Sequence, residues 1–188
     1  MAKEWVINVQ VNTLYVTELS GSGTWKNPIG GGQHWRDNVR MAAVSNESGD
    51  GIVVGTGDKF SLTVGKDDTI KWIVSEVNPI YGNYRSVCMY GFSEGQGWSE
   101  NLTPPSTVVQ EAGFIAMLNG FNAPNEPQGK YLECTQADIS IPQTTVRAGA
   151  SSGAIKYYMK LLLVNIEDPK KPVVLKYLQV DPTINIVK

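Results

Sequence analysis

The chain is poor in the residues that most often build reactive and metal-binding sites. Its 188 residues include one histidine, His34, and two cysteines, Cys88 and Cys134. A zinc site of the usual type needs more of these side chains, and a disulfide scaffold needs more than one bridge. Both cysteines stand in apolar, strand-like segments, so we expect two buried, reduced thiols that pack as small hydrophobic side chains. We expect no cofactor, with calcium as the alternative considered below.

Charge is scarce as well. Asp, Glu, Lys and Arg make up 18% of the chain, against about a quarter in a typical soluble protein. The net charge of −2 and the pI near 5.4 provide no general attraction to nucleic acid or to an anionic membrane. Because 41% of the residues are hydrophobic, the composition indicates a folded globular chain and not a disordered one.

Long apolar runs are missing too. No stretch approaches the roughly 18 residues that span a bilayer, and the longest run, residues 159–164, is interrupted by Lys160. The first residues lack the basic segment and the long apolar core of a secretion signal. We therefore expect a cytoplasmic protein with no membrane span, and release by a non-classical route is the alternative.

The sequence also lacks the common catalytic and nucleotide-binding motifs. It has no GxSxG nucleophile motif, and neither residues 30–32 nor residues 55–58 lead into the Lys-Ser/Thr pair of a phosphate-binding loop. A hydrolase built on His34 is a minor alternative, because a single histidine in a Gly-rich segment is more often a surface residue. We expect a protein that is not an enzyme.

The dominant pattern is a series of short segments in which apolar and polar residues alternate with period two. With 19 Gly and 10 Pro between them, these segments predict about ten strands joined by turns. The alternating or short apolar segments cover residues 5–11, 39–44, 52–54, 60–64, 69–74, 130–141, 173–180 and 184–187. Residues 85–92 are apolar at nearly every position, as in a strand buried on both faces, and residues 155–166 form the longest apolar segment. Residues 108–118 are the best helical candidate. We expect an all-β chain, a single antiparallel β-sandwich domain over residues 1–188 of jelly-roll or Greek-key type with long loops.

Aromatic and amide side chains gather in three loop segments. Flat rings beside amides suit the C–H faces and hydroxyls of sugars, so these segments are candidates for carbohydrate binding. The alternative is that the rings fill the ends of the sandwich core. The candidate residues are Trp25, His34, Trp35 and Asn38, then Tyr81, Asn83 and Tyr84, and finally Gln96 and Trp98.

Four aspartates stand in or beside Gly-containing turns, where carboxylates and carbonyls could hold calcium. They are Asp50, Asp58, Asp67 and Asp68. The spacing of an EF-hand loop is absent. The alternative is that each side chain accepts hydrogen bonds from its own turn, which requires no metal.

Several segments together resemble the PixA/AidA family of bacterial inclusion body proteins. A GTGDKF turn at residues 55–60 precedes VGKDDTIKW at residues 64–72, as a GTGDL-type turn precedes a VGD-x-(I/V)-x-W strand in that family. Tyr90-Gly91-Phe92, the Tyr157-Tyr158 pair and YLQVDPTI at residues 177–184 follow in the family's order. Two departures are Asn12, where the family has the Asp of a VDT element, and an ordinary content of five methionines.

Two hypotheses follow from the residues and the resemblance. The resemblance implies a non-enzymatic protein that accumulates in cytoplasmic inclusions of a host-associated bacterium, and it carries no catalytic residues over to this chain. The first hypothesis is therefore a self-associating homo-oligomer with a role in host interaction. The second is a lectin for host or bacterial glycans, with calcium assistance, that uses the loop aromatics.

Overall fold

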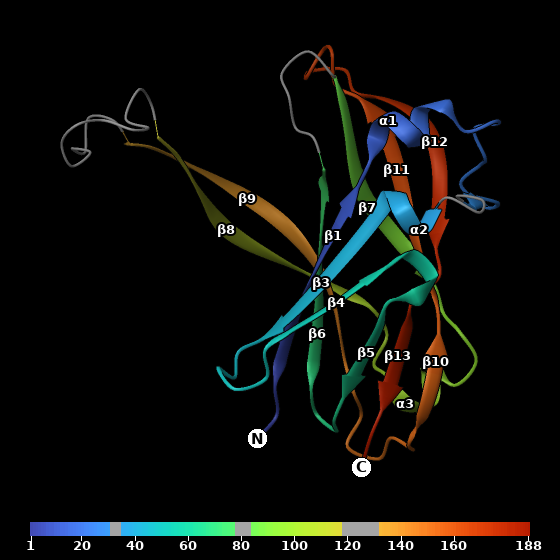
Figure 1. Ribbon diagram of the computed structural model, residues 1–188, viewed down its shortest axis with the longest axis vertical. Helices are drawn as coiled ribbons and strands as arrows, with labels where there is room; N and C mark the ends of the chain where they lie inside the picture. The colour runs from blue at the N-terminus through green and yellow to red at the C-terminus, as the bar shows by residue number, and fades with distance from the viewer. Residues whose placement is uncertain (31–34, 78–83, 118–131) are drawn as a thin grey trace.

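The computed structural model describes residues 1–30, 35–77, 84–117 and 132–188. Within these residues the chain forms thirteen β-strands, three short α-helices and one 3-10 turn. The prediction of an all-β fold is confirmed. The strands lie in three sheets around a common core (Figure 1).

The largest sheet has six strands in the order β4-β3-β1-β6-β9-β8. Their bounds are β1 (Glu4–Val11), β3 (Val39–Ser45), β4 (Ile52–Thr56), β6 (Thr69–Glu76), β8 (Ser106–Met117) and β9 (Leu132–Thr145). Successive side chains of β1 point alternately to the core and to solvent: Ile7 and Val9 are fully buried, while Asn8 and Gln10 are exposed. One face of this sheet therefore covers the core and the other faces solvent.

Two smaller sheets pack against the same core. One has the order β2-β12-β11-β7, and the other has the order β10-β13-β5. The strands are β2 (Ile29–Gly30), β5 (Ser61–Val64), β7 (Arg85–Ser93), β10 (Gly153–Lys156), β11 (Tyr158–Asn165), β12 (Val173–Val180) and β13 (Thr183–Ile186). In β11 the residues Met159, Leu161 and Leu163 are fully buried, so this strand alternates as β1 does.

Aromatic side chains occupy the centre of the core. The indole N–H of Trp72 donates a hydrogen bond to the Tyr157 hydroxyl at 3.0 Å, and both residues are buried. Phe92 and Trp98 pack around this pair, with ring centroids 4.9 to 6.0 Å from one another and from the pair. Burial raises the pKa of the Tyr157 hydroxyl far above its ordinary value, because the phenolate would lose its hydration.

Short helices close the ends of the core. They are α1 (Thr13–Glu18), α2 (Trp35–Asn38), the 3-10 turn η1 (Gly57–Lys59) and α3 (Trp98–Asn101). The Asn12 side chain caps α1 by accepting a hydrogen bond from the Tyr15 N–H at 3.3 Å. Helices α2 and α3 each begin at a buried tryptophan.

Three strand pairs differ from the antiparallel arrangement that we expected. β1 pairs with β6, β13 with β5, and β12 with β2, and all three pairs are parallel. The other strand pairs are antiparallel in the part of the chain that the structure describes. The strands of each parallel pair lie far apart in the sequence, so other elements connect them, as parallel pairing requires.

Two further expectations were wrong. Residues 108–117 belong to strand β8 and not to a helix. Cys88 and Cys134 are both free thiols, but both are exposed instead of buried. Cys88 is exposed because it follows the buried Val87 on β7 and points to the opposite face. Cys134 is exposed because β9 projects from the body.

The hairpin of β8 and β9 leaves the body of the molecule (Figure 1). β9 pairs with β6 only where Thr145, Thr144 and Gln143 face residues 69–71. From Leu132 to Pro142, β9 pairs with β8 alone among the described residues. We call residues 106–117 and 132–142 the arm, and the rest of the described chain the body.

Candidate functional site

The arm carries the longest unprotected strand edge in the described residues. β8 is the last strand of the six-stranded sheet and pairs only with β9 in the described ranges, so one side of its twelve-residue backbone has no described partner. Its sequence, STVVQEAGFIAM, contains one charged residue, Glu111, and no proline or lysine. Natural proteins usually protect such an edge with charges, prolines or a short length. The edge is therefore a surface onto which another strand could pair.

The two faces of the arm differ in chemistry. Opposite pairs in the hairpin share a face, which puts Gln110, Ala112 and Phe114 with Ile139 on one side. Val109 and Glu111 lie on the other side, where Glu111 stands directly opposite Asp138. Phe114 is 55% exposed and Val109 is 63% exposed. Each face thus offers a large apolar side chain to solvent.

A cleft of about 610 Å³ lies where the arm leaves the body. Strands β6 and β7 line it on one side and the arm lines it on the other. Most of its wall is apolar, with contributions from Trp72, Val74, Met89, Phe114, Ile139 and Ile141. Among the described residues, no carboxylate, amine or imidazole lines this cleft, so its described lining suits apolar side chains.

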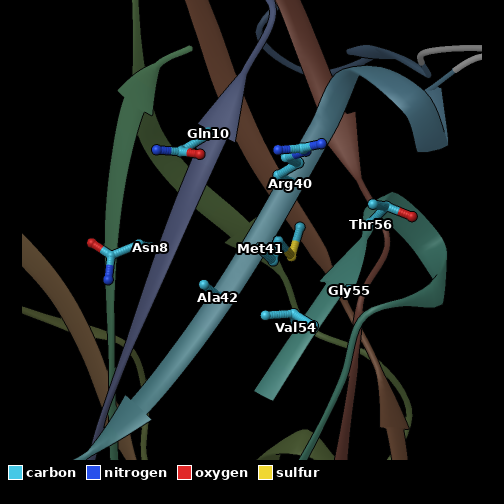
Figure 2. A pocket seen from close by; sticks show the side chains of 8 residues that line it. All are labelled: Asn8, Gln10, Arg40, Met41, Ala42, Val54, Gly55 and Thr56. Carbon is cyan, nitrogen blue, oxygen red and sulfur yellow. The ribbon is translucent and has the colours of Figure 1, made fainter. Parts of the chain in front are cut away.

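A second groove, of about 440 Å³, crosses the outer face of the same sheet. Figure 2 shows its lining residues, which come from β1, β3 and β4: Asn8, Gln10, Arg40, Met41, Ala42, Val54, Gly55 and Thr56. Gly55 is required here, because a Cβ atom would lie 2.8 Å from the Cα of Phe60. Arg40 is the one charged side chain among the described residues that line this groove. The groove is a shallow, mixed surface and not an assembled reactive centre.

An exposed aromatic cluster lies on the four-stranded sheet. Trp25 packs on Tyr90 with ring centroids 4.4 Å apart, and Tyr177 meets both rings edge-on at 5.9 and 6.3 Å. The Tyr90 hydroxyl donates a hydrogen bond to the Trp25 carbonyl at 3.2 Å. Trp25 remains 57% exposed. We call Trp25, Tyr90 and Tyr177 the aromatic cluster.

The segment that carries Trp25 is held tightly against β12. The Tyr177 N–H donates to the Ser22 carbonyl at 2.8 Å. Gly23 follows with φ of +64°, and a Cβ atom there would lie 2.6 Å from the Tyr177 carbonyl oxygen. Only glycine tolerates both the left-handed conformation and this approach. The aromatic cluster is therefore presented by a fixed backbone.

The structure separates the residues that the sequence suggested for sugar binding. Trp35 and Trp98 are buried, and their indole N–H groups donate to the carbonyls of Gln179 at 2.8 Å and Thr103 at 3.3 Å. The Asn38 side chain accepts a hydrogen bond from Asn12 at 2.8 Å.

Among the other sugar-binding candidates, Trp25, Tyr84 and Gln96 are exposed, while His34, Tyr81 and Asn83 lie outside the described residues. Sequence reasoning did not select Tyr90 and Tyr177, the two rings that accompany Trp25. Both residues lie in segments that carry the family resemblance. This resemblance is the sequence signal that could have pointed to them.

Two of the four candidate calcium ligands form ion pairs with basic side chains. Asp50 forms an ion pair with Lys3 at 2.6 Å, and Asp58 forms one with Arg36 at 2.9 Å. The hydrogen bond from Lys3 lowers the pKa of Asp50, and the one from Arg36 lowers the pKa of Asp58.

The two remaining aspartates lie next to each other in the chain. Asp68 is buried and accepts hydrogen bonds from the backbone N–H groups of Lys3 and Gly65 at 2.8 Å and from the Trp5 indole at 3.2 Å. Asp67 is exposed with φ of +64°. In the described ranges, no three or more His, Cys, Asp or Glu side chains gather as a metal site.

Comparison with known proteins adds a fold relationship. No family model matches the chain, and no curated protein matches it. A crystal structure of an inclusion body protein, PixA, from Burkholderia cenocepacia J2315 matches 99% of this chain and 97% of its own, with a TM-score of 0.62 and 12% sequence identity. At this identity the match shows a shared fold. Within the described residues, no helix is long and apolar enough to cross a membrane.

Proposed function

We propose that the protein is a non-enzymatic protein of inclusion body type that associates with copies of itself in the cytoplasm of a host-associated bacterium. The single observation that carries the self-association is the exposed β8 edge of the arm. The inclusion-body role is supported by the fold shared with PixA of Burkholderia cenocepacia and by the ordered motifs in the sequence.

The physical argument concerns the edge and the charge. A long, weakly charged edge offers a row of backbone donors and acceptors to another strand. Val109 and Phe114 would lose exposed apolar area when a strand covers them, and this burial favours association. The net charge of −2 opposes the approach of two copies only weakly.

The test measures molar mass by light scattering over a range of protein concentrations. We expect oligomers at neutral pH, and we expect Val109→Lys to weaken association about tenfold, the equivalent of ~1.4 kcal/mol. The matched control is Val54→Lys on β4, at the other edge of the same sheet, where the side chain is 74% exposed. A strict monomer at high concentration would refute the proposal. A loss of association in the β4 variant alone would move the contact to that edge.

A second function, carbohydrate binding, is favoured by the aromatic cluster. Trp25 is an exposed ring held on two partly buried tyrosines by a fixed backbone, and sugar C–H faces stack on exposed rings. A glycan array in the presence of calcium and in EDTA tests this function. We expect Trp25→Ala to abolish any binding and the exposed Tyr158→Ala, outside the cluster, to preserve it. An array with no signal in either condition would rule out the lectin.

A further inference from the structure

We infer that two copies of the chain pair through β8, antiparallel and edge to edge, about a twofold axis centred on Ala112. The inference rests on the proposed self-association and specifies its contact. It would extend the six-stranded sheet of one copy into the six-stranded sheet of the other. The structural basis is that β8 ends its sheet and that its free side has no described partner.

Symmetry restricts the register of such a pair. A twofold axis that relates two antiparallel edge strands stands perpendicular to the sheet, so each face of one copy continues into the same face of the other. Residues directly opposite each other in antiparallel strands also share a face. The axis must therefore pass between one residue and the same residue of the second copy.

Charge then selects between two registers. Centring on Glu111 or on Ala112 pairs nearly all of the twelve residues of β8. With Glu111 at the centre, two carboxylates would stand directly opposite each other, which is destabilising. With Ala112 at the centre, Glu111 stands opposite Gly113 of the second copy, which has no side chain. Residues 107–117 of the two copies then pair along their whole length.

The Ala112 register also extends the apolar wall of the cleft. Ala112 and Phe114 line the cleft, and Gln110 shares their face of the arm. In the Ala112 register, Phe114 of the second copy lies opposite Gln110 on that face. Its ring would continue the apolar wall beyond Ala112, where each chain alone ends its sheet. Each copy would thus supply an apolar side chain beside the cleft of the other.

The test is disulfide cross-linking of Ala112→Cys in a chain whose Cys88 and Cys134 are replaced by serine. Opposite residues of antiparallel strands have Cα atoms about 4.5 or 5.5 Å apart, within the range of a disulfide. We expect oxidised glutathione to convert most of this variant into a covalent dimer on a non-reducing gel. The matched control, Gln110→Cys in the same background, stays monomeric because the two substituted residues would lie about 13 Å apart.

The outcomes separate this inference from the proposed function. A cross-link at position 110 and not at 112 overturns the register. No cross-link at either position, in a protein that still associates, overturns the β8 pairing but leaves self-association standing. A background chain that is monomeric at every concentration overturns both. If Ala112→Cys does not fold by circular dichroism, a mixture of Glu111→Cys and Gly113→Cys chains tests the same register, since only the mixed dimer should cross-link.

Discussion

The body and the arm are built from the same kind of strand but bury very different amounts of it. Body strands such as β1 and β11 alternate fully buried and solvent-facing residues, and their inward side chains join one hydrophobic cluster. On the arm, Val109 and Phe114 are more than half exposed, although they are as apolar as core residues. The difference indicates that the buried residues of these body strands stabilise the fold, whereas exposed apolar residues of the arm such as Val109 and Phe114 are available for a contact outside the chain.

The largest expected effect is on the body. Leu161→Ala removes a fully buried side chain from β11 and leaves a cavity, so we expect a loss of about 2–5 kcal/mol in the free energy of unfolding. Phe114→Ala on the arm removes a larger side chain but should cost less than about 1 kcal/mol, because the ring is mostly exposed. Chemical denaturation measures both. Equal losses would show that the arm is part of the folding core.

Next in size is a hydrogen bond at the centre of the body. Tyr157→Phe leaves the buried Trp72 indole N–H without its acceptor, and we expect a loss of about 1–3 kcal/mol in the free energy of unfolding. The neighbouring Tyr158→Phe is the control, because its side chain is 42% exposed and the change should be close to neutral. If the two variants are equally stable, the Trp72–Tyr157 bond makes no net contribution.

A smaller effect is expected on the arm and with the opposite sign. Glu111 stands directly opposite Asp138, and the arm contains no Lys or Arg among its described residues. Glu111→Gln removes this repulsion within the arm, worth about 0.2–1 kcal/mol. It also removes the Glu111 charge of each copy, which the proposed β8 pairing brings near the other, so self-association should strengthen several-fold at low salt. Sedimentation equilibrium at two salt concentrations measures it, and the gain should shrink in high salt because ions screen the repulsion. Weaker association of this variant would contradict the β8 contact.

The smallest effect concerns an ion pair at the body surface. The hydrogen bond from Lys3 lowers the pKa of Asp50 in the folded chain, so the pair stabilises the fold above the unfolded pKa of the carboxyl and loses this effect as the pH falls through the folded pKa. Asp50→Asn should therefore lower the denaturation midpoint slightly at pH 7 and hardly at all near pH 2. A difference that persists in acid would point to another role for the side chain, such as its bond to Ser45.

The body could be predicted from the sequence because its strands are half buried. Alternation marks β1 and β5 directly, since burial on one face dictates an apolar residue at every second position. The same reasoning failed for β8, where both faces meet solvent and nothing enforces a period of two. The sequence therefore left residues 108–118 open to a helical interpretation.

The candidate sites were harder to predict than the strands. Trp35 and Trp98 follow glycine-containing segments that resemble exposed loops, yet each begins a short helix whose indole faces the core. Trp25 stands in a similar segment and is exposed. Composition does not distinguish a buried tryptophan from an exposed one, because burial depends on which residues of the folded chain pack over its segment. Tyr90 and Tyr177 join Trp25 only through the pairing of β7 and β12 with β11.

The arm joins the body through a short segment, so a small rotation at its base would displace its far end by a larger distance. Three residue pairs, between residues 69–71 of β6 and residues 143–145 of β9, join it to the body by strand pairing, and the buried Lys71 is held there by an ion pair with Glu4 at 2.8 Å. Twelve residues of strand extend about 40 Å, so a rotation of about 10° at this base would move the far end by about 7 Å. Two copies joined through their arms, as proposed, could thus hold their bodies at unequal angles.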